Sequence, residues 1–198
     1  HTPIRRQRQM CIRDRAYVQS IMGDNPEAIQ ARAAKARSKD LLLKYADFQT
    51  RYPGLLVQSV VGEALFELNA VSLLGYDEAS VRTALEPLVD SLIRIDWNRR
   101  QLDTAWAKLF SAAAIVEVLN LSDSSFSDED LLLLLSTMPE LKKVNLTGTE
   151  FSDEQVDSIR AHSKIETIVL TGTQLSEVGY QKLINHVPSA DVISDYSM

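Results

Sequence analysis

An internal repeat constrains the fold of this 198-residue chain more than any other feature of its sequence. Three segments align without gaps: VEVLNLSDSSFSDEDL from Val116, LKKVNLTGTEFSDEQV from Leu141 and IETIVLTGTQLSEVGY from Ile165. Their starts lie 25 and 24 residues apart, and each has apolar residues at offsets 0, 3, 5 and 10 from its start. A unit of this size cannot bury its apolar side alone, so the units must stack on one another.

The spacing within a unit predicts a strand, a turn and a helix. Apolar residues at offsets 3 and 5 alternate as in a strand, so both side chains point to the same face. Gly148 and Gly172 follow where the chain must bend sharply. A hydroxyl at offset 8 can hydrogen-bond the backbone along the stack, at Ser124, Thr149 and Thr173. The candidate helix N-caps come next, at Ser127, Ser152 and Ser176.

The L-x-L-S/T-G-T segments that end at Thr173 resemble bacterial leucine-rich repeats, whose period is roughly 20–29 residues. The resemblance implies an α/β fold, a short leucine-rich-repeat solenoid with parallel strands on its concave side and helices on its convex side. We expect this domain to occupy residues 53–198. Its units are expected near 68–91, 92–115, 116–140, 141–164 and 165–189, with a partial unit at 190–198.

The two earliest units are less regular. LIRIDWNRRQL from Leu92 again has apolar residues at offsets 0, 3, 5 and 10, and LNAVSLLGYDEASV from Leu68 has them at 0, 3 and 5 before a helix near Asp77. The alternative is that residues 77–113 form two plain helices. The repeat predicts parallel strands with a helix between each, near 68–73, 93–97, 117–121, 142–146 and 166–170.

Both ends of the repeat domain need a cover. Residues 55–71 are expected to form a hairpin that closes the N-terminal edge. A helical lead-in at 15–52 precedes it, in which residues 24–50 are expected to form a helix with Asp24 or Asn25 as its N-cap. ADVISDYSM, at the other end, predicts a last partial strand, and Asp191 and Asp195 would blunt its exposed edge.

Residues 1–14 are expected to lie outside the fold. They are densely basic, lack an apolar period, and resemble a translated sequencing-adaptor string of the kind found at the ends of metagenomic gene fragments. The alternative interpretation is a basic arm for nucleic acid or anionic lipid. We expect an artefactual or disordered segment and a natural protein that extends further upstream.

Composition excludes several classes of function. The net charge of -6 argues against a general nucleic-acid binder, which must neutralise phosphates. Cys11 is the only cysteine of the sequence, so we expect neither a disulfide nor a thiolate metal site. No apolar run approaches the roughly 18 residues that span a bilayer, so we expect no direct membrane insertion by this chain.

The sequence offers no nucleophile–base pair, phosphate loop or metal cluster, so we expect a protein that is not an enzyme and holds no cofactor or metal. His162 and His186 share one offset in adjacent repeats, but Thr137 stands at the equivalent position of the preceding repeat, which leaves no third ligand. Trp97 and Trp106 are expected to be buried in packing.

Offsets 2, 4 and 6 are expected to point away from the core, onto the concave sheet face. The middle column would begin at Ser72, and the strip as a whole is polar. We expect it to bind an unknown protein or peptide, because solenoids present such surfaces to partners; the alternative is a merely solvated sheet face. The candidate binding residues are Arg94, Asp96, Asn98, Asn120, Ser122, Lys143, Asn145, Thr147, Thr167 and Thr171.

Residues 55–198 also resemble the C-terminal repeat region of planctomycete-type membrane proteins with c-type cytochrome domains. The resemblance lies in VQSVVGEALFELNAVSL (57–73), DEASVRTALEPLVDSLIRIDW (77–97) and the repeats that follow. Members of that family carry membrane and haem domains upstream; this chain has no haem motif, so no haem-binding residue is carried over. The resemblance implies a non-catalytic interaction module in the periplasm, at the end of a larger protein. The alternatives are a structural spacer that packs against upstream domains, and a cytoplasmic location.

Overall fold

The computed structural model describes residues 26–159 and 164–196 of the chain. The chain divides into two compact units, residues 1–41 and 42–198. In the first unit, the described residues belong to helix α2 (Pro26–Arg51), which continues to the end of the expected lead-in. Residues 1–14 and the expected N-caps Asp24 and Asn25 lie outside the described residues.

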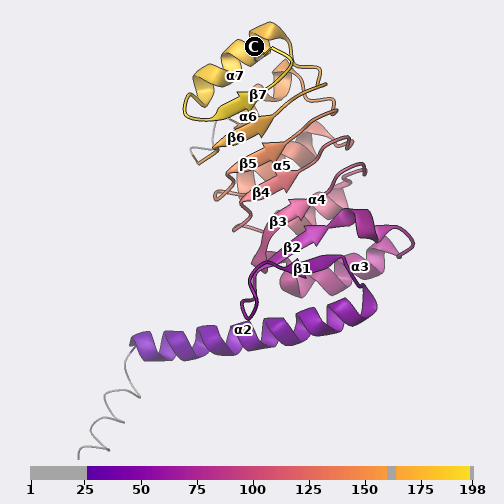
Figure 1. The fold of residues 1–198 in the computed structure, drawn as a ribbon, viewed down its shortest axis with the longest axis vertical. Helices are drawn as coiled ribbons and strands as arrows, with labels where there is room; N and C mark the ends of the chain where they lie inside the picture. Colours follow the sequence, from indigo (N-terminus) through magenta and orange to yellow (C-terminus); the bar gives the residue numbers. More distant parts are fainter. Residues whose placement is uncertain (1–25, 160–163, 197–198) are drawn as a thin grey trace, which may run out of the picture. The chain divides into compact units, whose positions relative to one another are not determined.

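An open sheet of seven strands runs through the second unit, in which the strands follow one another in chain order (Figure 1). The first two strands pair in antiparallel fashion, and every later pair is parallel. The strands are β1 (Leu56–Gln58), β2 (Phe66–Asn69), β3 (Leu92–Asp96), β4 (Val118–Asn120), β5 (Lys143–Asn145), β6 (Thr167–Val169) and β7 (Asp191–Ile193).

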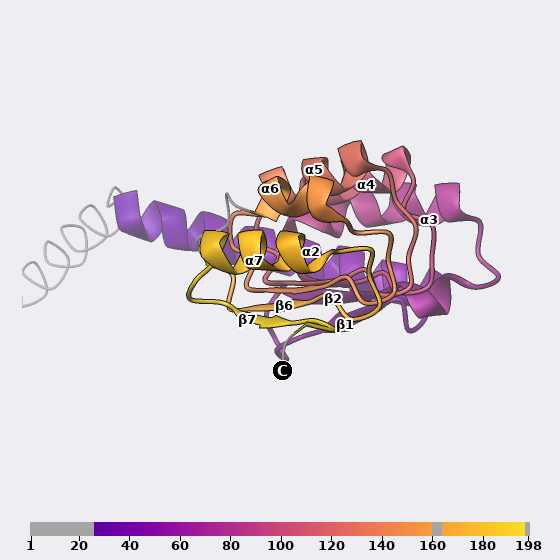
Figure 2. The same ribbon diagram turned by 90° about the horizontal axis from the view of Figure 1, so that it is seen from above.

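Helical segments connect the parallel strands, and helices α3 to α7 lie on one side of the sheet (Figure 2). The protein therefore has an α/β fold in which strands and helices form two layers of the second unit. The segments are η1 (Ala70–Leu73), α3 (Glu78–Leu85), η2 (Glu86–Ser91), α4 (Thr104–Phe110), α5 (Asp128–Thr137), η3 (Asp153–Gln155), α6 (Val156–Ile159) and α7 (Glu177–His186).

Most of the predicted strands are confirmed. Strands β3 to β6 fall within or at the edge of the four predicted ranges from 93 to 170, and they pair in parallel. The predicted hairpin is present as β1 and β2, and the last partial strand as β7. The alternative of two plain helices over 77–113 is wrong, because β3 lies between α3 and α4.

The unit predicted from Leu68 is wrong by three residues. Leu68 pairs with Ile95, which stands at offset 3 of its own unit, so Leu68 does not begin a unit. The chain leaves the sheet at Ala70 and enters η1, and Val71, expected in the core, is 50% exposed. An apolar spacing that begins at Leu65 matches the pattern as well as one that begins at Leu68, so spacing alone could not choose between them.

In each repeat, the helix or 3-10 helix that follows the strand begins with a side-chain cap. Its oxygen accepts a hydrogen bond from a backbone N–H two or three residues later, which satisfies a donor left free by the helix geometry. The three predicted serines are confirmed in this role, and Asp103 stands at the same offset in the preceding unit. The capping residues are Asp77, Asp103, Ser127, Ser152 and Ser176.

The predicted hydroxyl bond along the stack is present in one unit only. Ser124 Oγ donates to the Trp97 carbonyl of the preceding unit at 2.6 Å. Thr149 and Thr173 instead donate to the carbonyl three residues earlier in their own turns, at 2.7 and 2.8 Å. A short hydroxyl side chain has this local acceptor within reach, and in two units the local bond replaces the bond between units.

The apolar residues at offset 5 are buried and belong to the core. Leu121, Leu146 and Leu170 are all buried, as their position in the repeat predicts. Trp97, at the same offset, is also buried, and its ring contacts that of Trp106 with centroids 4.6 Å apart. Each of these four repeats therefore contributes at least one fully buried side chain to the core.

Replacing Leu146 by alanine should lower the free energy of unfolding by about 2–5 kcal/mol, because it leaves a cavity between two units. Leu132→Ala is the matched control: this side chain on α5 is 53% exposed, and its loss should change stability by no more than about 0.5 kcal/mol. Urea denaturation of both variants measures the difference. Equal effects of the two changes would show that Leu146 is not part of a packed core.

Asp153 joins the starts of two neighbouring helices. Its carboxylate accepts hydrogen bonds from the backbone N–H of Ser176 at 2.8 Å and from the Ser176 hydroxyl at 2.5 Å. These two bonds lower the pKa of the Asp153 carboxyl below its ordinary value, because they favour the charged form.

This link should make stability depend on pH. The pKa of Asp153 is lower in the folded than in the unfolded chain, so its contribution is complete above the unfolded-state value of about 3.9. The contribution is lost as the pH falls through the lower, folded-state pKa. Asp153→Asn should therefore lose less stability than the wild type between pH 7 and 3, in urea denaturation at each pH. Glu129→Gln, an exposed change at the start of α5, should keep the wild-type acid profile.

Candidate functional site

The candidate site is the face of the sheet opposite helices α3 to α7. Along each strand the residues at offset 3, such as Ile95 and Leu119, are buried, whereas the residues on either side of them are exposed or half-buried. We call this surface the strand face. It includes the ten residues predicted from the repeat, namely Arg94, Asp96, Asn98, Asn120, Ser122, Lys143, Asn145, Thr147, Thr167 and Thr171.

The register of the sheet arranges these side chains in rows across the strands. The first row runs through Arg94, Val118, Lys143 and Thr167, which are consecutive partners in β3 to β6. The second row runs through Asp96, Asn120, Asn145 and Val169 in the same register.

A third row lies just past the ends of the strands. The backbone ladder continues there, because Arg99 N–H donates to the Ser122 carbonyl, Asp123 N–H to the Thr147 carbonyl, and Gly148 N–H to the Thr171 carbonyl, at 2.7–2.9 Å. The structure thus brings together the third-row residues Asn98, Ser122, Thr147 and Thr171, and all ten predicted residues lie in three adjacent rows.

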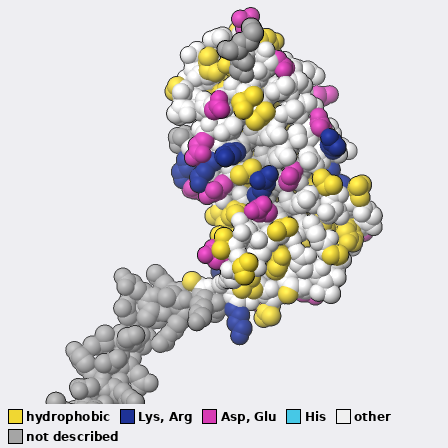
Figure 3. Space-filling view, viewed as in Figure 1, with side chains coloured by type: hydrophobic (Ala, Val, Ile, Leu, Met, Phe, Trp, Pro, Cys, Tyr) yellow, Lys and Arg dark blue, Asp and Glu magenta, His cyan; other side chains and the backbone are white. Residues whose placement is uncertain are grey.

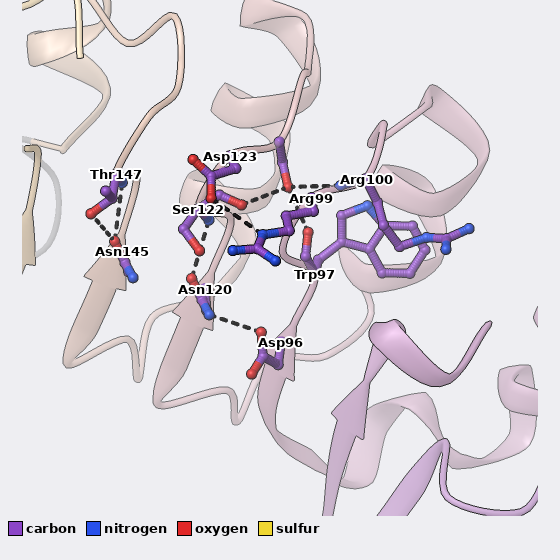
Figure 4. Close-up of polar contacts among 10 residues, drawn as sticks. Asp96, Trp97, Arg99, Arg100, Asn120, Ser122, Asp123, Asn145 and Thr147 are labelled. Carbon is purple, nitrogen blue, oxygen red and sulfur yellow. Dashed lines mark hydrogen bonds and ion pairs between the residues drawn. The ribbon is translucent and has the colours of Figure 1, made fainter. Parts of the chain in front are cut away.

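The asparagines of the second row also shape the backbone. Asn120 Oδ1 accepts a hydrogen bond from the N–H of Ser122 at 3.1 Å, and Asn145 Oδ1 accepts one from the N–H of Thr147 at 3.0 Å (Figure 4). Each is a turn closed by a side chain bonded two residues ahead. The oxygen of each side chain is therefore committed to ending its strand.

The two amide nitrogens of these asparagines differ in what they contact. Asn120 Nδ2 donates to Asp96 Oδ1 at 2.8 Å, which ties β4 to β3 through side chains. Asn145 Nδ2 makes no hydrogen bond within the described part of the chain, although its Oδ1 also accepts from the Thr147 hydroxyl at 2.7 Å. Asn145 therefore keeps two N–H donors for a ligand, and Asn120 does not.

The first row carries two cations without an anionic partner. Arg94 and Lys143 are exposed, and neither makes an ion pair with any residue that the structure describes. Lys142, the chain neighbour of Lys143, differs: its ammonium lies 2.9 Å from Glu117, and the hydrogen bond raises the pKa of Lys142 above its ordinary value.

The turns beside the strand face repeat one unusual backbone conformation. Gly148 and Gly172 have φ values of 67° and 68°, and the equivalent residues of the two preceding units, Arg99 and Asp123, have φ values of 56° and 54°. A residue with a side chain adopts this left-handed conformation at a cost, whereas glycine does not. Arg99 and Asp123 also form an ion pair across the units at 3.6 Å, next to an open hollow of about 350 Å³.

Figure 3 shows the strand face with its side chains coloured by type. Basic and acidic side chains are interspersed over the middle of the sheet, and hydrophobic side chains gather towards the end formed by β1 and β2. The exposed apolar residues there include Val57 and Val71, which are about half exposed. The face is therefore neither uniformly charged nor uniformly apolar.

Sequence reasoning missed two residues of this face. Asn69 pairs with Asp96 and so occupies the second-row position assigned to Ser72, and Glu67 lies beside Arg94. Asn69 Oδ1 accepts from the N–H of Val71 at 3.1 Å, as the later asparagines do with their own turns. The asparagine at offset 4 was the available signal, because aligning Asn69 with Asn120 moves the unit by the required three residues.

The histidines offer little for a metal. His162 lies outside the described residues, and His186 is half-buried with its Nδ1 3.8 Å from an Asp157 carboxylate oxygen. Residues 26–159 and 164–196 contain no group of three or more side chains placed to hold a metal ion. Trp97 and Trp106 are buried, as predicted, and so present no surface to a ligand.

Among the helices that the structure describes, none combines the length and apolar character needed to cross a bilayer.

Comparison of the chain with protein-family models and with curated proteins found no match.

The contacts of Asn120 predict that its replacement lowers stability. Asn120→Ala removes the acceptor for Ser122 N–H and the link to Asp96, so it should lower the free energy of unfolding by about 1–2 kcal/mol. Lys143→Gln, which breaks no contact within the described residues, should leave stability within about 0.5 kcal/mol of the wild type. Urea denaturation tests both. An Asn120→Ala protein as stable as the wild type would show that these bonds are not part of the fold's energetics.

Proposed function

We propose that residues 53–198 form a short leucine-rich-repeat solenoid whose strand face is its concave face and a non-catalytic protein–protein interaction surface. The observation that carries this proposal is the strand face itself: three rows of mostly polar side chains on the side of the sheet opposite α3 to α7, with unpaired cations at Arg94 and Lys143. Solenoids bind partners through extended faces of this kind.

Equivalent positions in successive units support the repeat. Helix or helical-turn caps stand at offset 11 in four units, at Asp103, Ser127, Ser152 and Ser176. The left-handed turn residues stand at offset 7 in the same units, at Arg99, Asp123, Gly148 and Gly172. One unit built four times explains both series, because a stacked repeat must turn at the same point in each unit.

The polar groups left available on the strand face favour a protein or peptide as the partner. The donors of Asn145 and the cations of Arg94 and Lys143 can bind carbonyl and carboxylate groups. Glu67 and Asp96 lie in the same rows and would repel a nucleic acid, in keeping with the net charge of -6.

We further propose that this domain is the periplasmic tail of a larger, membrane-anchored protein of the cytochrome type. This part of the proposal rests on the sequence resemblance of residues 57–73 and 77–97. The native gene tests it directly. Upstream codons for membrane helices and a C-x-x-C-H haem motif are expected, and a gene that begins near residue 15 without them would contradict the assignment.

The interaction surface can be tested by matched charge reversals. A photo-crosslinking amino acid at Thr167 should capture the partner, whose affinity is then measured with the purified protein. Lys143→Glu and Arg94→Glu should each weaken that binding at least about tenfold with unchanged melting temperature, because each replaces an attraction by a repulsion. Lys108→Glu, on exposed α4 surface, is the control and should bind as the wild type does.

The opposite pattern would identify a structural spacer. If helix changes such as Lys108→Glu or Gln181→Ala abolish binding and strand-face changes do not, the chain packs through its helices. Asp157, although it is an exposed helix residue, is a poor control, because Lys182 pairs with it at 2.9 Å.

A further inference from the structure

Arg94 and Lys143 are spaced regularly on the strand face. They are the first-row residues of β3 and β5, and Val118 of β4 lies between them in register with both. Adjacent strands lie about 4.8 Å apart, so the two cations arise from backbone positions about 9.6 Å apart along a line across the strands. A ligand that meets both cations must present anionic groups at about this spacing.

The surroundings of the two cations restrict that ligand. Lys143 lies between Val118 and Thr167 in its row, so neither neighbour there competes for its charge. Arg94 lies between Val118 and Glu67, and Asp96 follows it in the second row. A polyanion would meet these carboxylates as well as the cations. A chain with two isolated carboxylates and an uncharged segment between them avoids that repulsion and can lie over Val118.

The spacing selects among peptide conformations. In polyproline II each turn has three residues with a rise of 3.1 Å each, so residues i and i+3 share a side about 9.3 Å apart. In a β-strand, residues i and i+2 share a side only about 6.7 Å apart. Polyproline II also leaves its carbonyl groups unbonded, which suits the free Nδ2 donors of Asn145 in the adjacent row.

We propose that the strand face binds an acidic peptide in polyproline II conformation that lies across β3 to β5, with carboxylates three residues apart on Arg94 and Lys143. This inference rests on the proposed interaction function and adds the chemistry of the partner. Val118 contacts the residues between the two carboxylates, and Asn145 donates to the peptide backbone.

The test uses the full chain and a fluorescent, proline-rich octapeptide, capped at both ends, with two glutamates three residues apart. Fluorescence anisotropy should show binding that weakens as salt is added, because exposed charges are screened. Arg94→Gln and Lys143→Gln should each weaken binding about three- to fivefold, the loss expected for one exposed ion pair. Lys108→Gln, which removes the same charge from α4, should leave the affinity unchanged.

Matched peptides separate this chemistry from simple charge attraction. A peptide with the glutamates two residues apart should bind more weakly, and one with glutamines in their place should lose most of its affinity. Equal binding of all three peptides, or equal loss with Lys108→Gln, would overturn the proposal. Polyphosphate that binds through Arg94 and Lys143 where the octapeptide does not would also overturn it, in favour of a polyanion.

A peptide-display selection on the full chain distinguishes the failure of this inference from the failure of the proposed function. Selected peptides without acidic pairs that still lose binding on Thr167→Glu would overturn the acidic-peptide inference and leave an interaction surface in place. Selected peptides with acidic residues three apart that depend on Arg94 and Lys143 would support both. If selected peptides depend only on helix residues, both proposals fail.

Discussion

The parallel register between neighbouring strands determines both faces of the second unit. Residues at the same offset, such as Ile95, Leu119, Val144 and Ile168, are direct partners across the sheet, so each row is uniform in burial. Rows that face α4 to α7 form the core, and alternate rows form the strand face. A shift of one residue in any pair would exchange the two sets, so the hydrophobic effect and the backbone hydrogen bonds favour the same register.

The two edges of the sheet are finished in different ways. At one edge the chain folds back, and β1 pairs with β2 in antiparallel fashion. This hairpin covers the edge of β2 that the parallel strands leave open. At the other edge, β7 presents its free side with Asp191 exposed, and the carboxylate of Asp195 accepts from Gly172 N–H at 2.8 Å. A charged residue on an edge strand, as Asp191 is here, opposes pairing with another chain. Asp195, expected to do the same, lies past the end of β7 and bonds the turn at Gly172 instead.

The repeat predicted the elements whose positions follow from its period. It misplaced the first repeat, where two starting residues fit the apolar spacing. The parallel strands, the serine caps and the buried leucines follow from four apolar offsets. The first unit was misplaced because Leu65 and Leu68 begin equally good apolar patterns, and the choice between them depends on pairing with β3. The bonds of Thr149 and Thr173 could not be predicted either, because a hydroxyl chooses between two acceptors only once the turn is built.

In the candidate site, the sequence likewise predicts where side chains lie but not which hydrogen bonds they make. Offsets place ten residues on one face, but they do not say which polar groups the fold itself uses. Asn120 spends its oxygen on Ser122 N–H and its nitrogen on Asp96, so it holds two strands together and has little left for a ligand. Asn145 uses only its oxygen in this way. The second-row side chains of β3 and β4 are thus bonded to each other, whereas Asn145 of β5 closes its turn with Oδ1 and keeps its amide nitrogen available.

The first row is different, because no turn begins there and the fold requires nothing of its side chains beyond a β conformation. Arg94 and Lys143 keep their charges free for that reason, although Glu67 lies beside Arg94 in register. A solvated sheet would tolerate any polar residues at these positions, and ion pairs between neighbouring units are common elsewhere in the chain, as at Lys142 and Lys164. The absence of such pairing for these two cations, among the described residues, is the observation on which the proposed carboxylate-bearing partner rests.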